Sequence, residues 1–495
     1  MKQPLQSAAF PSHSLNNRPQ GFRVPRCSPF WAALATGALA ALPTLSPAQS
    51  TKPASPASKA SPVSAGLVND WLRAQSPEWK PWDIGGQIRV RYEAFDGGSP
   101  AAPNNDFQKT GADNQNDYLW TREKLHVGYT AKWFNAYVEG RNSNSAGDDA
   151  SPSTGEDSFD LHQAYLTLGN TKEFPVTAKV GRQELLYGDQ RLVGPSDWGN
   201  TGRVFDAAKL RYEDKNLWVD AFVSHVVLSV DGEFNDADSD DWFSGVYASS
   251  KTLIPIQESQ LYFLSRNVRP GSRTSVRDIY SVGARVKSLP GKLKGWDYAA
   301  EVVKQFGNIV QTGGVRRDQD AWAASVIGGF TFEKTLATPR LGLEYNFSTG
   351  DSDAADDTSE TLDNLFPTNH GKYGLMDFVG WRNIHDLCTS LSAKPHKKLT
   401  ATLEYHLFWL ADTHDSFYPQ SGSGRSGLGY GKNPTYDNFV GSELNLDVNY
   451  AVTAWAGLRG GYGHFFPGSY VDSSKQTRGG STGADWFYVQ ATFNF

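Results

Sequence analysis

The sequence has only two cysteines and two methionines among its 495 residues. Cys27 lies in a segment that we expect to be removed on export. Cys388 would then be the one remaining thiol, and no intramolecular disulfide could form in the mature chain. Nothing in the sequence around Cys388 would activate a thiol, so we interpret it as a small side chain in or at the end of a strand.

Long apolar runs and basic blocks are also scarce. The mean hydropathy is −0.49, and 39% of the residues are hydrophobic, which is too polar for a bundle of transmembrane helices. The net charge of −6 identifies no partner, and the lack of a basic block or an aromatic nucleic-acid motif argues against nucleic acid. The chain is instead rich in aromatic residues (13%) and glycine (48 residues), which favours β structure with many turns.

The first 48 residues predict a bacterial export signal, as in a Gram-negative cell. Basic residues precede the apolar run 31–43, and Ser46, Pro47 and Ala48 offer a small-residue cleavage site. The run is too short and too rich in alanine for a transmembrane anchor. Residues 49–81 begin with a Pro/Ala/Ser-rich stretch that cannot build a core, and we expect a periplasmic tether with a helical turn around Leu67–Leu72.

From Trp82 to Phe495 the dominant period is two, and we expect one β domain. Between residues 84 and 93, apolar Ile88, Val90 and Tyr92 alternate with Arg89 and Arg91. The same alternation recurs at 122–129, 134–139, 280–287, 340–347, 399–407 and 443–450. Such a period is typical of strands with a different environment on each face.

The alternation favours an all-β, closed antiparallel transmembrane β-barrel over a soluble sandwich. The apolar face thins to Ala, Gly and Val between aromatic ends, which suits a lipid-facing band with aromatic girdles, and the other face repeatedly carries charge. We count about eighteen strands, which lies within the range of outer-membrane barrels. Tight and long connections alternate between them, and the long ones lie at 96–116, 142–157, 186–202, 231–241, 307–318, 350–376, 412–438 and 467–483.

The last segment supports the same localisation. Residues 484–495 place Phe487, Val489, Ala491, Phe493 and Phe495 on one face. A terminal strand that ends on Phe resembles the signal read by the machinery that inserts barrels into the outer membrane. The predicted partners therefore include this machinery, outer-membrane lipid and lipopolysaccharide.

The stretch from Lys179 to Tyr212 has strand-like ends around a loop with Gly, Pro and Asp. This run, together with the first strands and the aromatic C-terminus, resembles the alginate export porin family from about Trp82 to Phe495. The resemblance implies an outer-membrane channel that passes an anionic polysaccharide and periplasmic export proteins that deliver it. It also implies that loop 186–202 folds inward and that Arg182, Arg191, Arg203 and Asp206 lie near the pore constriction.

The alternation of side chains between the two faces of each strand places a set of basic residues on the lumen face. The order of the strands around the barrel brings these residues to one wall of the pore. Glu301, Glu344, Glu404, Glu443 and Asp447 form a more acidic wall opposite. A basic wall would attract carboxylated sugars. The alternative is that these charges only keep the pore wet and pair with one another. The substrate-binding candidates from the strands are Arg89, Arg91, Arg122, Arg141 and Arg459.

Arg182 and Asp206 do not follow this parity. Arg182 is in phase with Val176, Ala178 and Val180, which would face lipid, and Asp206 is in phase with Val204 and Ala208. Either the strand bulges near Gly181, or Arg182 lies at the rim.

Two other functions remain open at this point, namely a general or uptake porin for small anions or oligosaccharides and, from another class, an outer-membrane enzyme. No nucleophile–base set or carboxylate pair stands out, so we expect no catalysis. We expect no cofactor, since the GxGxxG match at 422–427 lies in a long loop. We expect no metal either, because the histidines lack ligand spacing.

Overall fold

The structure is a computed structural model that describes residues 66–98, 106–108, 113–149, 155–311, 313–425, 430–474 and 481–495. The predicted export signal (1–48) and the first part of the predicted tether (49–65) lie outside these residues. The rest of the tether forms helix α1 (Leu67–Gln75) and the 3-10 turn η2 (Pro77–Trp79). The helix is longer than the turn expected around Leu67–Leu72.

Helix α1 is fixed to the first strand by polar contacts. The side-chain oxygen of Asn69 accepts a hydrogen bond from the backbone of Ile84 at 2.8 Å, and Arg73 donates to the carbonyl of Trp82 at 2.9 Å. No helix in the described part of the chain is long and apolar enough to cross a membrane.

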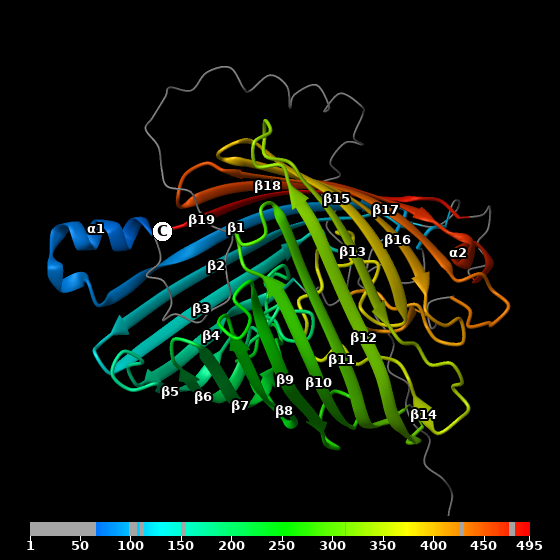
Figure 1. Cartoon of the computed structure of the whole chain (residues 1–495), viewed down its shortest axis with the longest axis horizontal. Coiled ribbons are helices and arrows are strands. Elements are labelled where there is room, and N and C mark those ends of the chain that lie inside the picture. The colour runs from blue at the N-terminus through cyan, green and yellow to red at the C-terminus, as the bar shows by residue number, and fades with distance from the viewer. Residues whose placement is uncertain are drawn as a thin grey trace, which may run out of the picture. The chain divides into compact units, whose positions relative to one another are not determined.

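Eighteen antiparallel strands form one closed barrel in the described part of the chain, which confirms the predicted fold class (Figure 1). A short strand, β14 (Thr358–Ser359), pairs in parallel with β12 from inside a long connection. The barrel strands are β1 (Trp82–Asp96), β2 (Asn116–Thr130), β3 (Phe134–Ala146), β4 (Asp157–Leu168), β5 (Val176–Gln183), β6 (Phe205–Glu213), β7 (Leu217–Val227), β8 (Ala237–Ser250), β9 (Gln257–Val268), β10 (Arg277–Ser288), β11 (Trp296–Val310), β12 (Arg316–Thr331), β13 (Arg340–Ser348), β15 (Ile384–His396), β16 (Leu399–Leu410), β17 (Phe439–Ala451), β18 (Ala456–Pro467) and β19 (Ala484–Asn494).

Closure depends on the pairing of the first strand with the last. β19 lies beside β1 in Figure 1, and the two pair from Gln87 opposite Asn494 to Asp96 opposite Asp485. Beyond this ladder, the backbone groups of Gly86 and Phe495 exchange two hydrogen bonds of 3.0 Å. The first strand therefore begins and the last strand ends at the same end of the barrel, as an even number of strands requires.

The two faces of the strands differ as the period of two predicts. On β2, the side chains of Leu125 and Val127 are 54% and 47% exposed on the outer face, whereas Arg122, on the other face, is 2% exposed. On β1, Ile88 and Val90 point outward, and Arg89 and Arg91 are buried inside. The outer face carries the apolar band that a bilayer requires.

The connections differ in length between the two ends of the barrel. Turns of two to eight residues join the strands at one end, and most connections at the other end are longer. In outer-membrane barrels the short turns face the periplasm and the long loops face outside, which sets the orientation of this barrel.

A charge on the lipid face should cost far more stability than the same charge in the lumen. Leu403, on the outer face of β16, is 43% exposed, and its neighbour Thr402 faces the lumen opposite Asp447. We expect Leu403→Arg to lower the free energy of unfolding by about 2 kcal/mol, because arginine is poorly solvated in hydrocarbon. Denaturant titration in lipid vesicles measures this.

Thr402→Arg is the matched control and should change stability little, because its cation meets lumen water and Asp447. Equal losses for the two variants would contradict the assignment of the faces.

Candidate functional site

Two long loops occupy the lumen and pair with each other. The first joins β5 to β6 (residues 184–204), and the second joins β13 to β15 (349–383); we call them the inner loops. The amides of Phe366 and Thr368 donate to the carbonyls of Leu192 and Gln190, both at 2.9 Å, and the amide of Gly194 donates to Phe366 at 2.8 Å. The inward course of 186–202 that the family resemblance implied is thus seen, together with a second inner loop.

Arginines of β1 and β2 hold the first inner loop by its backbone. Arg89 donates to the carbonyl oxygens of Asp197 and Gly199 at 2.7 and 3.0 Å, and Arg91 donates to that of Trp198 at 2.8 Å. Arg122 contacts both the carbonyl and the carboxylate of Asp197, at 3.1 and 2.9 Å. Three of the predicted lumen arginines therefore meet on residues 197–199.

Trp198 lies at the centre of this contact. Its ring stacks on His370 of the second inner loop, with centroids 3.6 Å apart and planes 6° apart. The guanidinium carbon of Arg91 lies 3.8 Å from the centre of the Trp198 ring, and that of Arg459 on β18 lies 5.5 Å away. The tryptophan thus joins the two inner loops to the basic wall.

The other predicted arginines bind parts of the inner loops as well. Arg141 on β3 donates to the carbonyl of Thr201 and pairs with Asp157. Arg191 and Arg203 belong to the first inner loop itself, and each reaches across to a neighbour. Arg191 donates to Glu344 of β13 at 2.6 Å, and Arg203 donates to the carbonyl of Pro367 at 2.8 Å.

Arg182 and Asp206 are not brought to this cluster. They lie opposite each other near the loop ends of β5 and β6 and form a two-pronged ion pair, with distances of 2.8 and 3.1 Å. The ladder keeps its register through Gly181, whose φ is +121°. Of the two alternatives for Arg182, the position at the rim fits the structure better than a bulge.

The residues of the predicted acidic wall also serve the loops. A carboxylate oxygen of Glu443 on β17 accepts hydrogen bonds from the amides of Leu375 and Met376, at 2.7 and 3.1 Å. Asp447 is occupied by Arg459, with the Nε of Arg459 at 2.9 Å. Glu443 thus contacts the second inner loop, Glu344 contacts Arg191 of the first, and Asp447 pairs with the opposite wall.

The inward course of the second loop is the main feature that the sequence reasoning missed. The sequence marks 350–376 only as a long connection, and residues 350–360 are mostly polar. Its later part carries an unusual density of apolar and aromatic side chains, and these lie buried in the structure. That density is the feature of the sequence that indicates an inward course. The buried residues are Leu362, Leu365, Phe366, Tyr373, Leu375, Met376, Phe378, Val379 and Trp381.

Electrostatic surroundings keep the carboxylate of Asp197 in the first inner loop ionised. Enclosure in the barrel raises the pKa of Asp197, but the charges of Arg122, Lys124 and Arg89 outweigh it and hold the pKa well below the usual range of an aspartate. Burial and the nearby Arg266 lower the pKa of Arg203 to about 10, so this side chain stays cationic at neutral pH.

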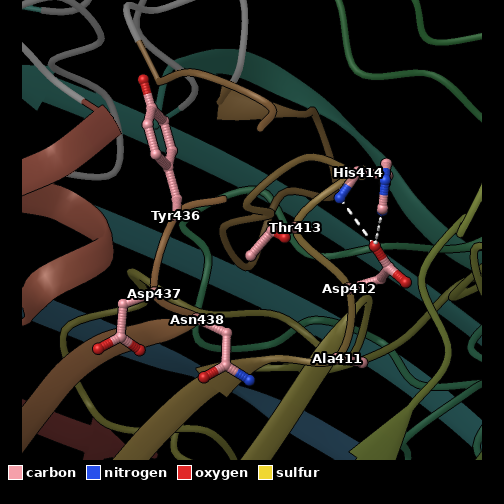
Figure 2. A pocket seen from close by; sticks show the side chains of 7 residues that line it. All are labelled: Ala411, Asp412, Thr413, His414, Tyr436, Asp437 and Asn438. Atoms are coloured by element: carbon pink, nitrogen blue, oxygen red, sulfur yellow. Dashed lines mark hydrogen bonds and ion pairs between the residues drawn. The ribbon is translucent and has the colours of Figure 1, made fainter. Parts of the chain in front are cut away.

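A separate hollow of about 390 Å³ lies at the outer end, where the loop between β16 and β17 begins and ends (Figure 2). Asp412, Asp437 and His414 line it, and Asp412 binds the His414 ring nitrogen at 2.7 Å. No lysine or arginine lines it among the described residues. This lining does not suit an anionic solute.

The closed barrel, its apolar outer band and its inner loops define the class of the protein as an outer-membrane channel. The sequence model of the family described as "Alginate export" matches residues 80–485. The chain belongs to this family, as its motifs indicated, and its location is the bacterial outer membrane. Comparison with curated proteins finds no match.

Solved structures agree on the fold. A BenF-like porin from Pseudomonas fluorescens Pf-5 aligns with a TM-score of 0.55 and 10% identity, over 84% of this chain and 98% of that one. OccAB1 of Acinetobacter baumannii aligns with a TM-score of 0.54 and 12% identity, over 84% of this chain and 97% of that one. OpdQ of Pseudomonas aeruginosa aligns with a TM-score of 0.53 and 12% identity, over 84% of this chain and 98% of that one. At these identities the likeness shows the barrel fold alone.

Removing one anchor should loosen the first inner loop. Arg122→Ala deletes charge-assisted contacts to Asp197, each of which stabilises a structure by about 1.5–3 kcal/mol. We expect more frequent current fluctuations in single-channel recordings, because the state in which the loop is displaced becomes more populated. Arg340→Ala is the control, since Arg340 is a lumen cation that pairs with Asp297 at 2.6 Å and is not seen to contact the inner loops. Equally quiet recordings from both variants would contradict the anchoring role.

The same contact predicts how the channel responds to acid. A carboxylate with a depressed pKa supports the structure at all pH values above its usual pKa of about 4, and its contribution is lost only as pH falls through the depressed value. We therefore expect the contact of Asp197 with Arg122 to add no change in the fluctuations between about pH 7 and pH 4, so wild type and Asp197→Asn should have pH profiles of the same shape over that range. A rise in noise near pH 5 that Asp197→Asn abolishes would show that Asp197 is not held by these cations.

Proposed function

We propose that the chain is a passive outer-membrane channel for an anionic, alginate-like polysaccharide, which passes a constriction lined by cations. The observation that carries the proposal is the nature of the partners of Arg89 and Arg203. Arg89 donates to two carbonyls and to the amide oxygen of Asn200, and Arg203 donates to the carbonyls of Gly194 and Pro367. These acceptors are neutral, and the nearby carboxylate of Asp197 is shared with Arg122 and Lys124, so part of the field of both guanidinium groups still acts on a passing solute.

A low-dielectric wall strengthens such charges. Fields from lumen charges extend into the water of a pore over roughly 8–10 Å at physiological ionic strength. A polyuronate carries a carboxylate on each sugar, so many weak, screened attractions act at once along the polymer. This arrangement favours passage of a polyanion without holding any single sugar tightly.

Membership of the alginate export family supports the polysaccharide as substrate. A general or uptake porin for small anions or oligosaccharides is the second candidate, because the similar solved structures include one named a porin. Two inner loops that narrow the lumen suit small solutes as well. We propose transport and no catalysis for either case.

The wider setting belongs to the same proposal. An export signal at 1–48 would deliver the chain to the periplasm of a Gram-negative cell, and Phe495 would be read by the insertion machinery. The outward apolar band would contact lipid and lipopolysaccharide. Periplasmic export proteins would deliver the polymer.

Planar-bilayer recording tests the function. We expect anion preference despite the net charge of −6, and a fall in conductance when a polyuronate is added. Arg89→Gln should lower the anion-to-cation permeability ratio and weaken the block, and Arg89→Lys should largely preserve both, because it keeps the charge.

A neutral polysaccharide of the same length is the control for steric block. Conductance that a polyuronate leaves unchanged would reject the polysaccharide channel. If small anions still passed, the second candidate would replace it.

A further inference from the structure

The short turns at the periplasmic end carry an unusual charge. Of the eight turns, seven contain lysine, and together they hold nine lysines and three acidic residues, a net charge of +6. All eight turns lie in the described part of the chain. We call these nine residues the lysine ring: Lys132, Lys172, Lys215, Lys251, Lys292, Lys294, Lys334, Lys397 and Lys398.

Most of these lysines are available to a partner. All but Lys398 are exposed. Lys132 pairs with Glu173 at 2.8 Å and Lys251 with Glu258 at 3.7 Å, whereas the other seven form no ion pair among the residues that the structure describes. An exposed charge without a counter-charge acts on solutes at a distance.

The basic character continues just inside the periplasmic mouth. Lys179 faces the lumen four residues into β5, and it forms no ion pair within the described ranges. Its ammonium nitrogen lies 3.4 Å from the centre of the Tyr165 ring. A polymer that reaches the lysine ring therefore meets a further basic side chain on its way in.

The outer end has the opposite charge. The seven connections there other than the two inner loops contain 12 acidic and 7 basic residues in the sequence, a net charge of −5. The barrel thus presents a basic periplasmic end and an acidic outer end, within a chain whose net charge is −6.

Anionic lipid headgroups are the simplest alternative partner for surface lysines. Lipopolysaccharide places phosphates on the outer side of this membrane, so lysines selected for lipid contact would be expected at the outer end too. The outer connections are instead acidic. The asymmetry therefore favours a soluble polyanion that arrives from the periplasm.

We propose that the lysine ring captures the anionic polymer at the periplasmic mouth and gives the channel an export direction. This inference rests on the proposed function and adds a location and a direction to it. The ring raises the local concentration of the polyanion at the entrance. The acidic outer connections repel polymer that has left, so re-entry is slower than entry.

The test compares polyuronate block from the two sides of a planar bilayer. Channel orientation is verified with a membrane-impermeant thiol reagent on Asn216→Cys, an exposed position in the β6–β7 turn. We expect the rate of block onset to be roughly tenfold higher from the periplasmic side at low salt. The two rates should converge near 1 M salt, where screening acts over about 3 Å.

A variant with Lys292→Gln, Lys294→Gln, Lys334→Gln and Lys397→Gln should lose most of the difference between the sides. The same four positions changed to arginine are the matched control and should keep it. Equal rates from both sides in the wild type, or an unchanged difference in the glutamine variant, would overturn the inference while leaving the channel function standing. Block from neither side would instead reject the proposed function.

A lipid role gives a different result. If the glutamine variant keeps the asymmetric block but loses stability only in vesicles that contain anionic phospholipid, then the lysines bind headgroups and the capture role is rejected.

Discussion

Every strand of this barrel must satisfy its backbone hydrogen bonds within the wall, because hydrocarbon offers no partner for an open edge. The pairing of β1 with β19, extended by Gly86 and Phe495, removes the last such edge. A closed wall fixes which residues face lipid and which face inward. That division in turn decides where the many charged residues of a polar chain can reside.

Charges enclosed in a barrel also need partners, since an isolated ion away from water is strongly unfavourable. Here much of that need is met by the backbone of the inner loops. Arg89, Arg91 and Arg122 bind the peptide carbonyls of residues 197–199, and Glu443 binds two amides of the second loop. The side chains of the wall hold the loops in place, and the backbone of the loops supplies hydrogen-bond partners for those side chains. Acceptors without charge leave part of the field of the arginines intact.

The sequence predicted the barrel, the approximate strand number and the inward side of Arg89, Arg91, Arg122, Arg141 and Arg459, because a period of two depends only on neighbouring residues. Contact partners could not be predicted in this way. Arg191 meets Tyr373, which is 182 positions away, and only the folded barrel brings the two together. Arg182 and Asp206 both alternate in phase with residues that face lipid, which is consistent with their pairing. Alternation does not show where along a strand the membrane boundary lies, so their position at the rim could not be predicted. The inward course of the second inner loop was not predicted, because its acidic first part is typical of a solvated loop and the apolar residues come only later in the segment.

The parallel contact between residues 190–194 and 366–368 also has a consequence for how the molecule is assembled. It joins segments that are separated by the eight barrel strands β6–β13, so it can form only after that part of the chain has been made. Contacts so distant along the chain are slow to form. A barrel whose wall is complete before this contact forms would have an unfilled interior, and it would be a distinct, leaky intermediate of assembly.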